Sequence, residues 1–464
     1  MMFDLERIVR IVGGDVSGRL VNCPLNGVST DSRNIEPGSL FIALRGERFD
    51  GHDYLGQAVK NGAAACLSED VVKGLSVPVV RVRNTLDALG DIAAAWRLQL
   101  QGPLVAITGS AGKTTTKEML AGIFDSLGPG LKTAGNFNNL IGLPLTLLRL
   151  VPEHQWAVIE MGTSALGEIE RLTAIAQPTI GIITNVGAAH LETLHGLDGV
   201  ARAKGELFAG LQGGVAVINL DDPRVAKLPI ANGVKKRTYG LSADADVRAD
   251  NISENDGRPS FELVFAGRRR QVELNVPGCH NIANALAAAA AAIELSVPLD
   301  TIAAALSAFR AVAGRMNLID LADGSLLLDD CYNSNPLSAA AGLDALATLK
   351  GEGRRVAVLG DMLELGETAE EMHRELGEKA AQVADLLIAV GGFAETLRRG
   401  AIGAGLNEEN VIALTDARAA ADYVMKHRQQ SDRILVKGSR GVKLEQVVEA
   451  LRSADEPTVD GKRS

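Results

Sequence analysis

The segment TGSAGKTTTKE at 108–118 has residue types and a spacing that suit phosphate chemistry. It follows the apolar run LVAIT at 104–108, which predicts a buried strand, and it leads into a predicted helix from Lys113. Gly109 and Gly112 can adopt backbone angles that other residues resist, which lets consecutive N–H groups surround phosphate oxygens at the start of the helix. The segment therefore predicts a nucleotide-binding loop.

Side chains of this loop add charge and metal chemistry. Lys113 is placed to neutralise the terminal phosphates of a nucleotide, and the Thr114 hydroxyl is placed to ligate Mg²⁺. Ile107 stands where the full phosphate-loop pattern has its first glycine, so the loop is a shorter variant. A glycine-rich turn without a ligand is the plain structural alternative. The residues predicted to contact the nucleotide here are Thr108, Gly109, Ser110, Ala111, Gly112, Lys113, Thr114 and Thr115.

Two polar residues follow other predicted strands. Glu160 ends the run WAVIE at 156–160, and His190 lies just past TIGIITN at 179–185. Because ligands gather at the carboxyl ends of parallel strands, both side chains could face the phosphate site and bind a metal ion. A core or surface histidine is the alternative for His190. Lys204 falls on a predicted helix, where a solvated lysine is the usual explanation.

Alternating strands and helices must position these side chains. From 103 onward, short apolar runs alternate with amphipathic helical stretches, which is typical of a parallel sheet with crossover helices. A second series of the same kind begins near Gly314. The sequence predicts an α/β protein of three domains: a small N-terminal α/β module at 1–83, a central ATPase-like domain with a mostly parallel sheet at 84–313 that includes a connector helix at 84–100, and a Rossmann-like domain at 314–453, followed by a flexible tail at 454–464.

Composition limits the class of protein. Apolar residues make up 46% and charged residues 22% of the chain, which is typical of a globular protein. The net charge of −10 argues against a nucleic-acid binder held by bulk charge. The four cysteines lie far apart, so neither a zinc site nor a disulfide framework is indicated. No segment has the pattern of a signal peptide or a membrane helix, and we expect a cytoplasmic protein that binds neither nucleic acid nor membrane.

An ordered set of motifs resembles the ATP-dependent Mur ligases over nearly the whole chain. Beside the phosphate loop these motifs are STDSRNIEPGSLFIALRGERFDGHDY at 29–54, GNFNNLIGLP at 135–144, EMGTS at 160–164, ITNVGAAHLE at 183–192, ARAKGELF at 201–208, NLDDPR at 219–224, GCHNIANALAA at 278–288, GRM at 314–316, DDCYNSNP at 329–336, LGDMLELGE at 359–367 and VKGSRG at 436–441. LGDMLELG and GNFNN are similar to the members that add D-alanyl-D-alanine. The DNPR motif of the diaminopimelate-adding relatives is missing from the C-terminal domain.

The resemblance implies a reaction and its substrates. In this family a substrate carboxylate attacks the γ-phosphate of ATP, which gives an acyl phosphate and ADP, and an amine then displaces phosphate to form an amide. For this chain the implied substrates are UDP-N-acetylmuramoyl-tripeptide and D-alanyl-D-alanine, in peptidoglycan precursor synthesis. The resemblance also implies Mg²⁺ at two sites and a monomer. Whether the third residue of the acceptor peptide is meso-diaminopimelate or lysine stays open.

Catalytic and metal-binding roles follow residue by residue from the resemblance. Lys113, His190 and Lys204 are the expected catalytic residues. Thr114 and Glu160 would hold one Mg²⁺, and His190 would ligate the second. Lys204 matches the family's carbamylated lysine, in which CO2 turns the ammonium into an anion that can hold Mg²⁺ directly or orient it through water.

Further nucleotide contacts are implied on both sides of a domain junction. Asn281 and Asn284 match the segment that receives the adenine, although capping of the following helix is an alternative for Asn281. Closure about a hinge near 313–315 would bring in contacts from the C-terminal domain. The residues expected to contact ATP after closure are Arg315, Asp330, Tyr332 and Asn333.

The remaining implied contacts concern the other substrates. Residues expected against the uridine diphosphate are Thr30, Asp31, Ser32, Arg33, Arg45 and Gly46, since short polar groups suit uracil and arginine suits pyrophosphate. Residues expected to line the peptide cleft are Asn136, Phe137, Asn138 and Asn139. Lys437, Ser439 and Arg440 could reach substrate or phosphate, or could form a charged surface loop.

Other functions remain open from the sequence. One is another Mur-type ligase or a relative that adds amino acids to folate, although the uridine-type N-terminal segment and LGDMLELG count against both. Another is a nucleotide-gated binding module without catalysis, which the intact Lys113, Glu160 and Lys204 argue against. Ala111 departs from the asparagine that relatives often carry, with little expected consequence because the loop acts through its backbone.

Overall fold

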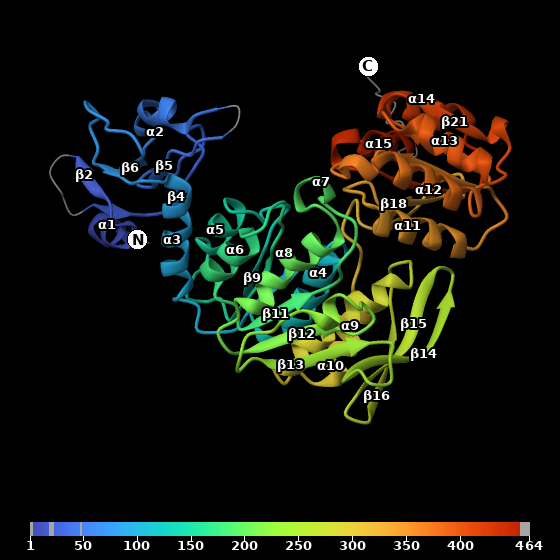
Figure 1. The fold of residues 1–464 in the computed structure, drawn as a ribbon, viewed down its shortest axis with the longest axis horizontal. Helices are drawn as coiled ribbons and strands as arrows, with labels where there is room; N and C mark the ends of the chain where they lie inside the picture. Colours follow the sequence, from blue (N-terminus) through green and yellow to red (C-terminus); the bar gives the residue numbers. More distant parts are fainter. Residues whose placement is uncertain (1–2, 18–22, 47–48, 455–464) are drawn as a thin grey trace, which may run out of the picture.

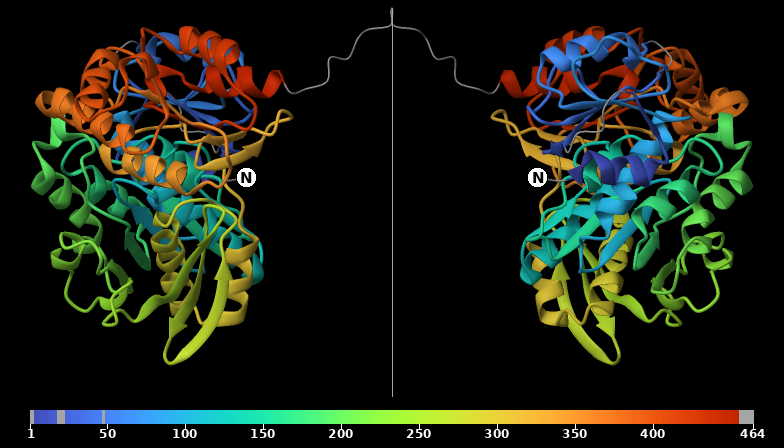
Figure 2. Two further views of the ribbon diagram at one scale, coloured as in Figure 1. Left: turned by 90° about the vertical axis from the view of Figure 1, so that its right-hand side faces the viewer. Right: turned by 90° about the vertical axis from the view of Figure 1, so that its left-hand side faces the viewer.

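Three α/β bodies follow one another along the chain (Figure 1), which confirms the predicted fold class. The structure, a computed structural model, describes residues 3–17, 23–46 and 49–454. The predicted flexible tail at 454–464 lies, except for its first residue, outside these residues. The N-terminal and C-terminal bodies both lie on the same side of the central body (Figures 1 and 2).

The N-terminal body is built on a five-stranded sheet in the order β2-β7-β6-β5-β4, in which only β2 is antiparallel to its neighbour. A short antiparallel pair, β1 with β3, lies beside it. The strands are β1 Phe3–Asp4, β2 Asp15–Ser17, β3 Pro24–Leu25, β4 Val28–Ser29, β5 Leu40–Ile42, β6 Ala65–Ser68 and β7 Val79–Arg81. The helices are α1 Leu5–Val12, η1 Gly51–Tyr54 and α2 Leu55–Lys60.

Helix α3, Thr85–Arg97, connects the N-terminal and central bodies. Its start is capped by Asn84, as its sequence favours. Near its end the buried Arg97 guanidinium donates to the carbonyls of Ala176 at 2.8 Å and Leu100 at 3.2 Å. These bonds anchor the connector to the central body.

The central body contains a nine-stranded sheet in the order β16-β15-β14-β13-β12-β11-β8-β10-β9. The strands from β8 to β14 are parallel, and β15 and β16 extend the sheet as an antiparallel hairpin arrangement. The strands are β8 Leu104–Thr108, β9 Gly130–Lys132, β10 Trp156–Glu160, β11 Ile180–Ile183, β12 Val215–Asn219, β13 Lys235–Gly240, β14 Val247–Asn255, β15 Arg258–Phe265 and β16 Arg268–Glu273.

Apolar residues alternate between the two faces of the central strands. On β8, Leu104 and Ala106 face the core shared with α3, α6 and α8, whereas Val105 and Ile107 face the core shared with α4, α9 and α10. The helices of this body are α4 Lys113–Phe124, η2 Asp125–Leu127, α5 Gly142–Leu147, α6 Glu168–Ala176, α7 Leu191–Leu194, α8 Leu197–Ala209, η3 Val225–Lys227, α9 His280–Glu294 and α10 Leu299–Ala308. No helix in the described part of the chain is long and apolar enough to cross a membrane.

The C-terminal body has a six-stranded sheet in the order β17-β18-β22-β19-β20-β21, parallel except for the edge strand β17. The strands are β17 Asn317–Asp320, β18 Leu326–Asp329, β19 Arg355–Gly360, β20 Leu386–Val390, β21 Val411–Leu414 and β22 Arg433–Lys437. The helices are α11 Pro336–Thr348, η4 Gly366–Thr368, α12 Ala369–Ala381, α13 Ala394–Gly403, η5 Glu408–Asn410, α14 Ala417–His427, η6 Arg440–Val442 and α15 Glu445–Ser453.

Candidate active site

A cleft of about 850 Å³ lies where strands of the central and C-terminal sheets end. Its walls bring together most of the residues predicted from the sequence: Gly109, Ser110, Ala111, Gly112, Lys113, Thr114, Thr115, Asn136, Asn138, Asn139, Glu160, His190, Lys204, Asn284, Arg315, Asp330, Tyr332, Asn333, Lys437, Ser439 and Arg440. Thr108 and Asn281 are buried and do not line it, and Phe137 is half exposed away from its lining. The residues predicted for uridine diphosphate lie on the N-terminal body instead.

The loop between β8 and α4 depends on two glycines. Gly109 and Gly112 have φ angles of +151° and +81°, in the region that favours glycine. A Cβ on Gly109 would lie 1.8 Å from the Thr184 hydroxyl oxygen, and a Cβ on Gly112 would lie 2.2 Å from Asn284 Oδ1. The loop can therefore follow this path only with glycine at both positions.

Asn185, at the end of the ITN run, fixes this loop. It accepts from the Ser110 amide through its carbonyl at 3.1 Å and from the Ala111 amide through Oδ1 at 2.8 Å. These two amides are thus occupied, and the first-turn amides of α4 are the ones left to face a phosphate. Sequence reasoning did not single out Asn185, although its position just past a strand was an available signal.

Lys113 is the first residue of α4 and points back over the loop. Its Nζ donates to the Gly109 carbonyl at 2.7 Å, and no ion pair of Lys113 is found among the described residues. Burial lowers the pKa of Lys113, Glu160 opposes this shift, and the Arg315 charge adds to it. A negatively charged group beside Lys113 would therefore be strongly favoured.

Glu160, at the end of β10, lies opposite the start of α4. Its Oε2 accepts from the Thr114 hydroxyl at 2.9 Å, and its Oε1 accepts from Asn138 Nδ2 at 3.0 Å. The carboxylate is 3% exposed, so its two oxygens are held in fixed directions. Thr114 and Glu160 thus form a pair of oxygen donors beside the phosphate loop, which is the donor type that Mg²⁺ prefers.

A metal ion in this cleft would have few side-chain ligands. No group of three or more His, Cys, Asp or Glu side chains with metal-binding geometry occurs among the described residues. A cation here would complete its shell with phosphate oxygens and water, as Mg²⁺ commonly does.

Lys204 lies on α8 with its side chain only 3% exposed, so the solvated-helix explanation is wrong. Within the described chain its Nζ makes no hydrogen bond or ion pair. Burial, and then the charge of Lys113, lower its pKa well below the ordinary lysine value. A neutral amine facing the cleft is a nucleophile, whereas a bare ammonium there would repel a cation.

His190 precedes α7 in a left-handed backbone conformation, with φ at +54°. Its Nδ1 lies 2.5 Å from Glu364 Oε2, a residue of LGDMLELG in the C-terminal body. This contact lowers the pKa of Glu364. While it lasts, only the other ring nitrogen, Nε2, is available for a metal ion.

Asn281 and Asn284 lie in the first turns of α9, which begins at His280. Asn281 donates to the Pro277 carbonyl at 2.7 Å and accepts from Asn284 at 2.9 Å. Its side chain does not cap the helix, so the capping alternative is wrong. Asn284 also accepts from the Thr116 hydroxyl at 3.3 Å, which links α9 to α4 behind the phosphate loop.

Two arginines stack on one aromatic ring at the cleft. The guanidinium carbons of Arg315 and Arg440 lie 4.1 Å and 5.0 Å from the centre of the Tyr332 ring. Both cations lie against the face of the ring, and neither is paired with a carboxylate in the part of the chain that the structure describes. The arrangement leaves two positive groups for an anionic ligand.

Asp330 lies in the C-terminal wall and is paired. Its Oδ2 lies 2.5 Å from Lys437 Nζ, and its Oδ1 accepts from the Met316 amide at 3.1 Å. Lys437 also donates to the Asn333 carbonyl at 3.1 Å. The charged-surface alternative fails for Lys437 and Ser439, which are buried, while Arg440 is exposed.

Asn335 joins the two walls and was not among the predicted residues. Its Nδ2 donates to the Ser110 carbonyl in the phosphate loop at 3.1 Å, while its Oδ1 caps α11 by accepting from the Ser338 amide. The signal was present in DDCYNSNP, where asparagine before proline is a typical helix cap. The contact across the cleft could not be read from that pattern.

The residues predicted to contact the peptide lie in the segment that precedes α5. Asn138 contacts Glu160, and Asn139 Oδ1 accepts from the Gly142 amide at 2.8 Å and so orders the start of α5. Asn136 lines the cleft. Phe137 is 50% exposed, so its ring is free to contact a ligand outside the cleft lining.

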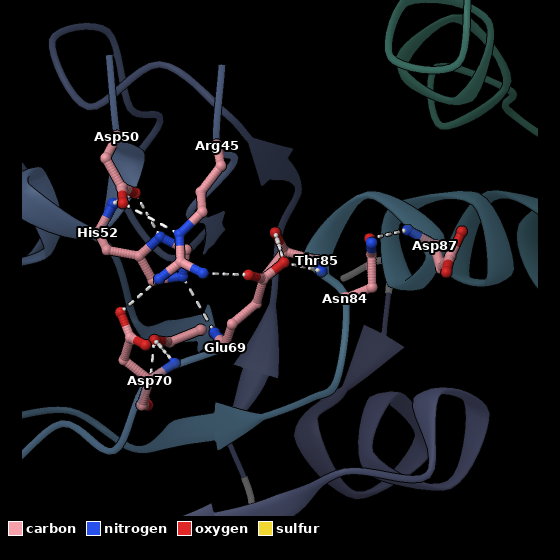
Figure 3. Close-up of polar contacts among 9 residues, drawn as sticks. Arg45, Asp50, His52, Glu69, Asp70, Asn84, Thr85 and Asp87 are labelled. Carbon is pink, nitrogen blue, oxygen red and sulfur yellow. Dashed lines mark hydrogen bonds and ion pairs between the residues drawn. The ribbon is translucent and has the colours of Figure 1, made fainter. Parts of the chain in front are cut away.

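On the N-terminal body, Arg45 is enclosed by acidic residues (Figure 3). It lies 3.0 Å from Asp50, 2.7 Å from Glu69 and 2.8 Å from Asp70. Glu69 also accepts from the Thr85 amide at 3.0 Å, so the cluster is attached to the start of α3. In this arrangement Arg45 is already neutralised, and a pyrophosphate would have to displace carboxylates from it.

Arg33 is paired in the same way. It donates to both Asp31 oxygens at 2.9 Å, and its hydrogen bonds lower the pKa of Asp31 to about 2. Ser32 is buried and its carbonyl accepts from Asn61. Thr30 is half-buried and Gly46 is exposed on this body. Both cations predicted to contact the uridine diphosphate are therefore already paired with carboxylates.

Family models match three successive parts of the chain. The Mur ligase middle domain matches 107–292, and the model described as Mur ligase, glutamate ligase domain matches 314–440. The model described as Mur ligase family, catalytic domain matches 24–97.

Individual proteins are similar over nearly their whole length. The UDP-N-acetylmuramoyl-tripeptide–D-alanyl-D-alanine ligase of Escherichia coli K12 is 41% identical over 97% of this chain and 98% of its own. The crystal structure of MurF from Acinetobacter baumannii superposes with a TM-score of 0.90 at 34% identity, over 97% and 99% of the two chains. The MurF ligase of Thermotoga maritima in complex with ADP gives a TM-score of 0.82 at 29% identity, over 93% and 98%.

Proposed function

The chain belongs to the Mur ligase family, and we propose how its cleft carries out the family's chemistry. It is an ATP-dependent ligase that joins D-alanyl-D-alanine to UDP-N-acetylmuramoyl-tripeptide in peptidoglycan precursor synthesis. The observation that carries the site assignment is the single cleft in which the phosphate loop, Glu160 and Lys204 meet residues of the C-terminal body.

The reaction proceeds in two displacement steps. A carboxylate oxygen of the tripeptide attacks the γ-phosphorus of ATP, the bond from phosphorus to the β,γ-bridging oxygen breaks, and an acyl phosphate and ADP form. The amine of D-alanyl-D-alanine then attacks the acyl carbon, loses a proton and expels inorganic phosphate. Positioning and charge neutralisation supply most of the rate in such phosphoryl transfer.

The chain's own cations neutralise the transferring group. Lys113 lies over the phosphate loop and is paired with no carboxylate of the described residues, so an incoming γ-phosphate takes the place of the Gly109 carbonyl as its acceptor. Arg315 and Arg440, stacked on Tyr332, approach from the C-terminal wall. The first-turn amides of α4 bind the remaining phosphate oxygens.

Mg²⁺ suits the oxygen donors of Thr114 and Glu160, which lie 2.9 Å apart beside the phosphate loop. When bound there it neutralises charge that develops between the β- and γ-phosphates. His190 could hold a second ion through Nε2. The hydrogen bonds from Thr114 and Asn138 to Glu160 orient these oxygen donors before any ligand binds.

Lys204 is proposed to carry a carbamate. Its depressed pKa supplies a neutral amine, which attacks the carbon of CO2, forms an N–C bond and loses a proton. The product places a negative group where the Lys204 Nζ has no hydrogen bond or ion pair to any described residue. The sign of the local field then suits a cation.

The N-terminal body is proposed to bind the uridine diphosphate portion of the acceptor through the loops that carry Thr30, Asp31, Ser32, Arg33, Arg45 and Gly46. The segment with Asn136, Phe137, Asn138 and Asn139 is proposed to contact the peptide between that body and the cleft. Three domains at 1–83, 84–313 and 314–453, acting as a monomer in the cytoplasm, complete the proposal.

A complete reaction mixture tests the function. The purified chain with ATP, Mg²⁺, D-alanyl-D-alanine and the nucleotide tripeptide, with diaminopimelate or lysine at its third position, should yield the pentapeptide product and one ADP per bond by mass spectrometry. Acceptor labelled with ¹⁸O in its carboxylate should transfer one ¹⁸O to the released phosphate. ADP formation without amide product, or product with a free amino acid in place of the dipeptide, would contradict the assignment.

A further inference from the structure

Lys117 is a buried cation that the mechanism above does not use. We infer that Lys117 and Thr133 form a support that holds Glu160 and the segment 134–139 in register with the phosphate-loop helix. Lys117 is then a positioning residue for the ligase reaction. The inference rests on the proposed function only for the role of Glu160.

The surroundings of Lys117 define what it holds. It lies on α4 one turn after Lys113, and its side chain is 2% exposed. Its Nζ donates to the Thr133 carbonyl at 2.8 Å and lies 3.0 Å from Glu118 Oε1. The ammonium therefore links helix α4 to the chain that directly follows β9.

Thr133 in turn contacts Glu160 and its strand. The Thr133 hydroxyl accepts from the Glu160 amide at 2.9 Å, and the Thr133 amide donates to the Val158 carbonyl at 3.1 Å. Thr114, also on α4, donates to the Glu160 carboxylate. Helix α4 thus holds Glu160 twice, at its side chain through Thr114 and at its backbone through Lys117 and Thr133.

The same support sets the start of the peptide segment. Residues 134–139 begin directly after Thr133, and Asn138 returns to Glu160 through its Nδ2 at 3.0 Å. The Gly162 amide also donates to the Asn138 carbonyl at 2.8 Å. A shift at Thr133 would therefore move Glu160 and the peptide segment together.

Charge pairing explains why a lysine is tolerated inside the protein. Burial would raise the pKa of Glu118, but the bonds from Lys132 and Lys117 outweigh this and lower it. Lys132 reaches Glu118 Oε2 at 2.5 Å from the surface, where it is 47% exposed. A buried ion pair rarely adds stability over apolar packing of the same shape, so its value here lies in the geometry it imposes.

Arg97 provides a matched control for Lys117. It is also a buried cation that donates to backbone carbonyls, but those belong to Ala176 at the end of α6 and Leu100 just after α3, and neither residue lines the cleft. Lys117→Met and Arg97→Met should both lower the melting temperature. Only Lys117→Met should lower kcat per folded molecule, by about tenfold or more, with KM for D-alanyl-D-alanine changed less than threefold.

Hydrogen exchange supplies a readout that is independent of turnover. In Lys117→Met, amides of 131–139 and of 156–162 should exchange at least tenfold faster, while those of 104–108 stay protected; Arg97→Met should leave all three segments unchanged. Lys117→Arg should restore part of the kcat, because arginine keeps a donor for Thr133. Equal kcat in the two methionine variants, or unchanged exchange at 131–139, would overturn the inference.

Thr133→Val keeps the test usable if Lys117→Met does not fold. Valine has the shape of threonine and removes only the acceptor for the Glu160 amide, so the same fall in kcat and faster exchange at 156–162 are expected. Normal kcat in folded Thr133→Val would also overturn the inference. Wild-type protein in the same assay separates the two proposals. If it makes no amide product, the proposed function fails. The hydrogen-exchange result would still show whether Lys117 and Thr133 hold the segments around Glu160 in place.

Discussion

Two regions of the molecule hold cations that the sequence assigned to phosphate groups, and they hold them in opposite ways. In the cleft, Lys113 is partly buried and bonded to a carbonyl, and Arg315 rests on the Tyr332 ring. On the N-terminal body, Arg45 is bonded to three carboxylates (Figure 3), and Arg33 to another.

The two regions differ in the electrostatic stabilisation that a phosphate gains when it binds. In the cleft, the partly buried ammonium of Lys113 has lost part of its water and has no carboxylate partner among the described residues, so a phosphate supplies the missing charge. At Arg45 a phosphate would only exchange one set of anions for another, in a setting screened by solvent. Glu69 also bonds Thr85 at the start of α3, so this cluster serves in the structure to fix the connector helix.

The largest effect is expected at Lys113. Lys113→Ala removes the cation that faces the transferring phosphate and should lower kcat/KM about a thousandfold, on the order of 4 kcal/mol of transition-state stabilisation. The fold should persist, as judged by circular dichroism. Turnover close to that of the wild type in folded Lys113→Ala would remove the phosphate loop from the mechanism.

The next largest effect is expected at Lys204, where a substitution distinguishes a carbamate from a cationic lysine. Lys204→Ala should lower kcat about a hundredfold, and formate or acetate should restore part of this, because a small carboxylate can occupy the space left by a carbamate. Rescue by methylamine would instead identify a cationic lysine. Activity within about twofold of the wild type would mark Lys204 as having no part in the reaction.

Asn335 tests whether the two walls act together. Asn335→Asp keeps the cap of α11 but loses the amide donor to the Ser110 carbonyl and places a carboxylate there, so KM for ATP should rise about tenfold. Asp416, which caps α14 far from the cleft lining, gives the matched control. Asp416→Asn should leave KM for ATP unchanged, and an equal change in both variants would contradict a specific contact across the cleft.

A smaller effect concerns stability and pH. The folded pKa of Lys204 is lowered by burial, so between that value and the ordinary value near 10.4 the unfolded chain binds more protons and the wild type gains stability as pH rises. In CO2-free buffer, Lys204→Met should therefore melt about 2–4 °C above the wild type at pH 7, with the difference shrinking toward pH 10. A difference that grows with pH would contradict the depressed pKa.

The sequence predicted the sheet strands better than the contacts between loops. The runs at 104–108 and 156–160 are strands with the predicted bounds, because continuous apolar runs in a two-sided parallel sheet have sharp ends. The glycines of the phosphate loop were also predictable, since their backbone angles leave few alternatives.

Contacts across the cleft could not be predicted in this way. Asn335 reaches Ser110 across 225 positions of sequence, and Glu364 reaches His190 from a different body. Neither contact has a local pattern, because each depends on how two folded sheets are placed. The pairing of Arg45 was missed for the same reason, since Glu69 and Asp70 follow a different strand.

One paired binding measurement tests the contrast between the two regions most directly. Calorimetry would compare binding of a non-hydrolysable ATP analogue to wild type and Lys113→Met with nucleotide-tripeptide binding to wild type and Arg45→Met. Lys113→Met is expected to lose at least tenfold in affinity for the ATP analogue, whereas Arg45→Met is expected to lose less than threefold in acceptor affinity. A loss at Arg45 equal to or greater than that at Lys113 would contradict this contrast.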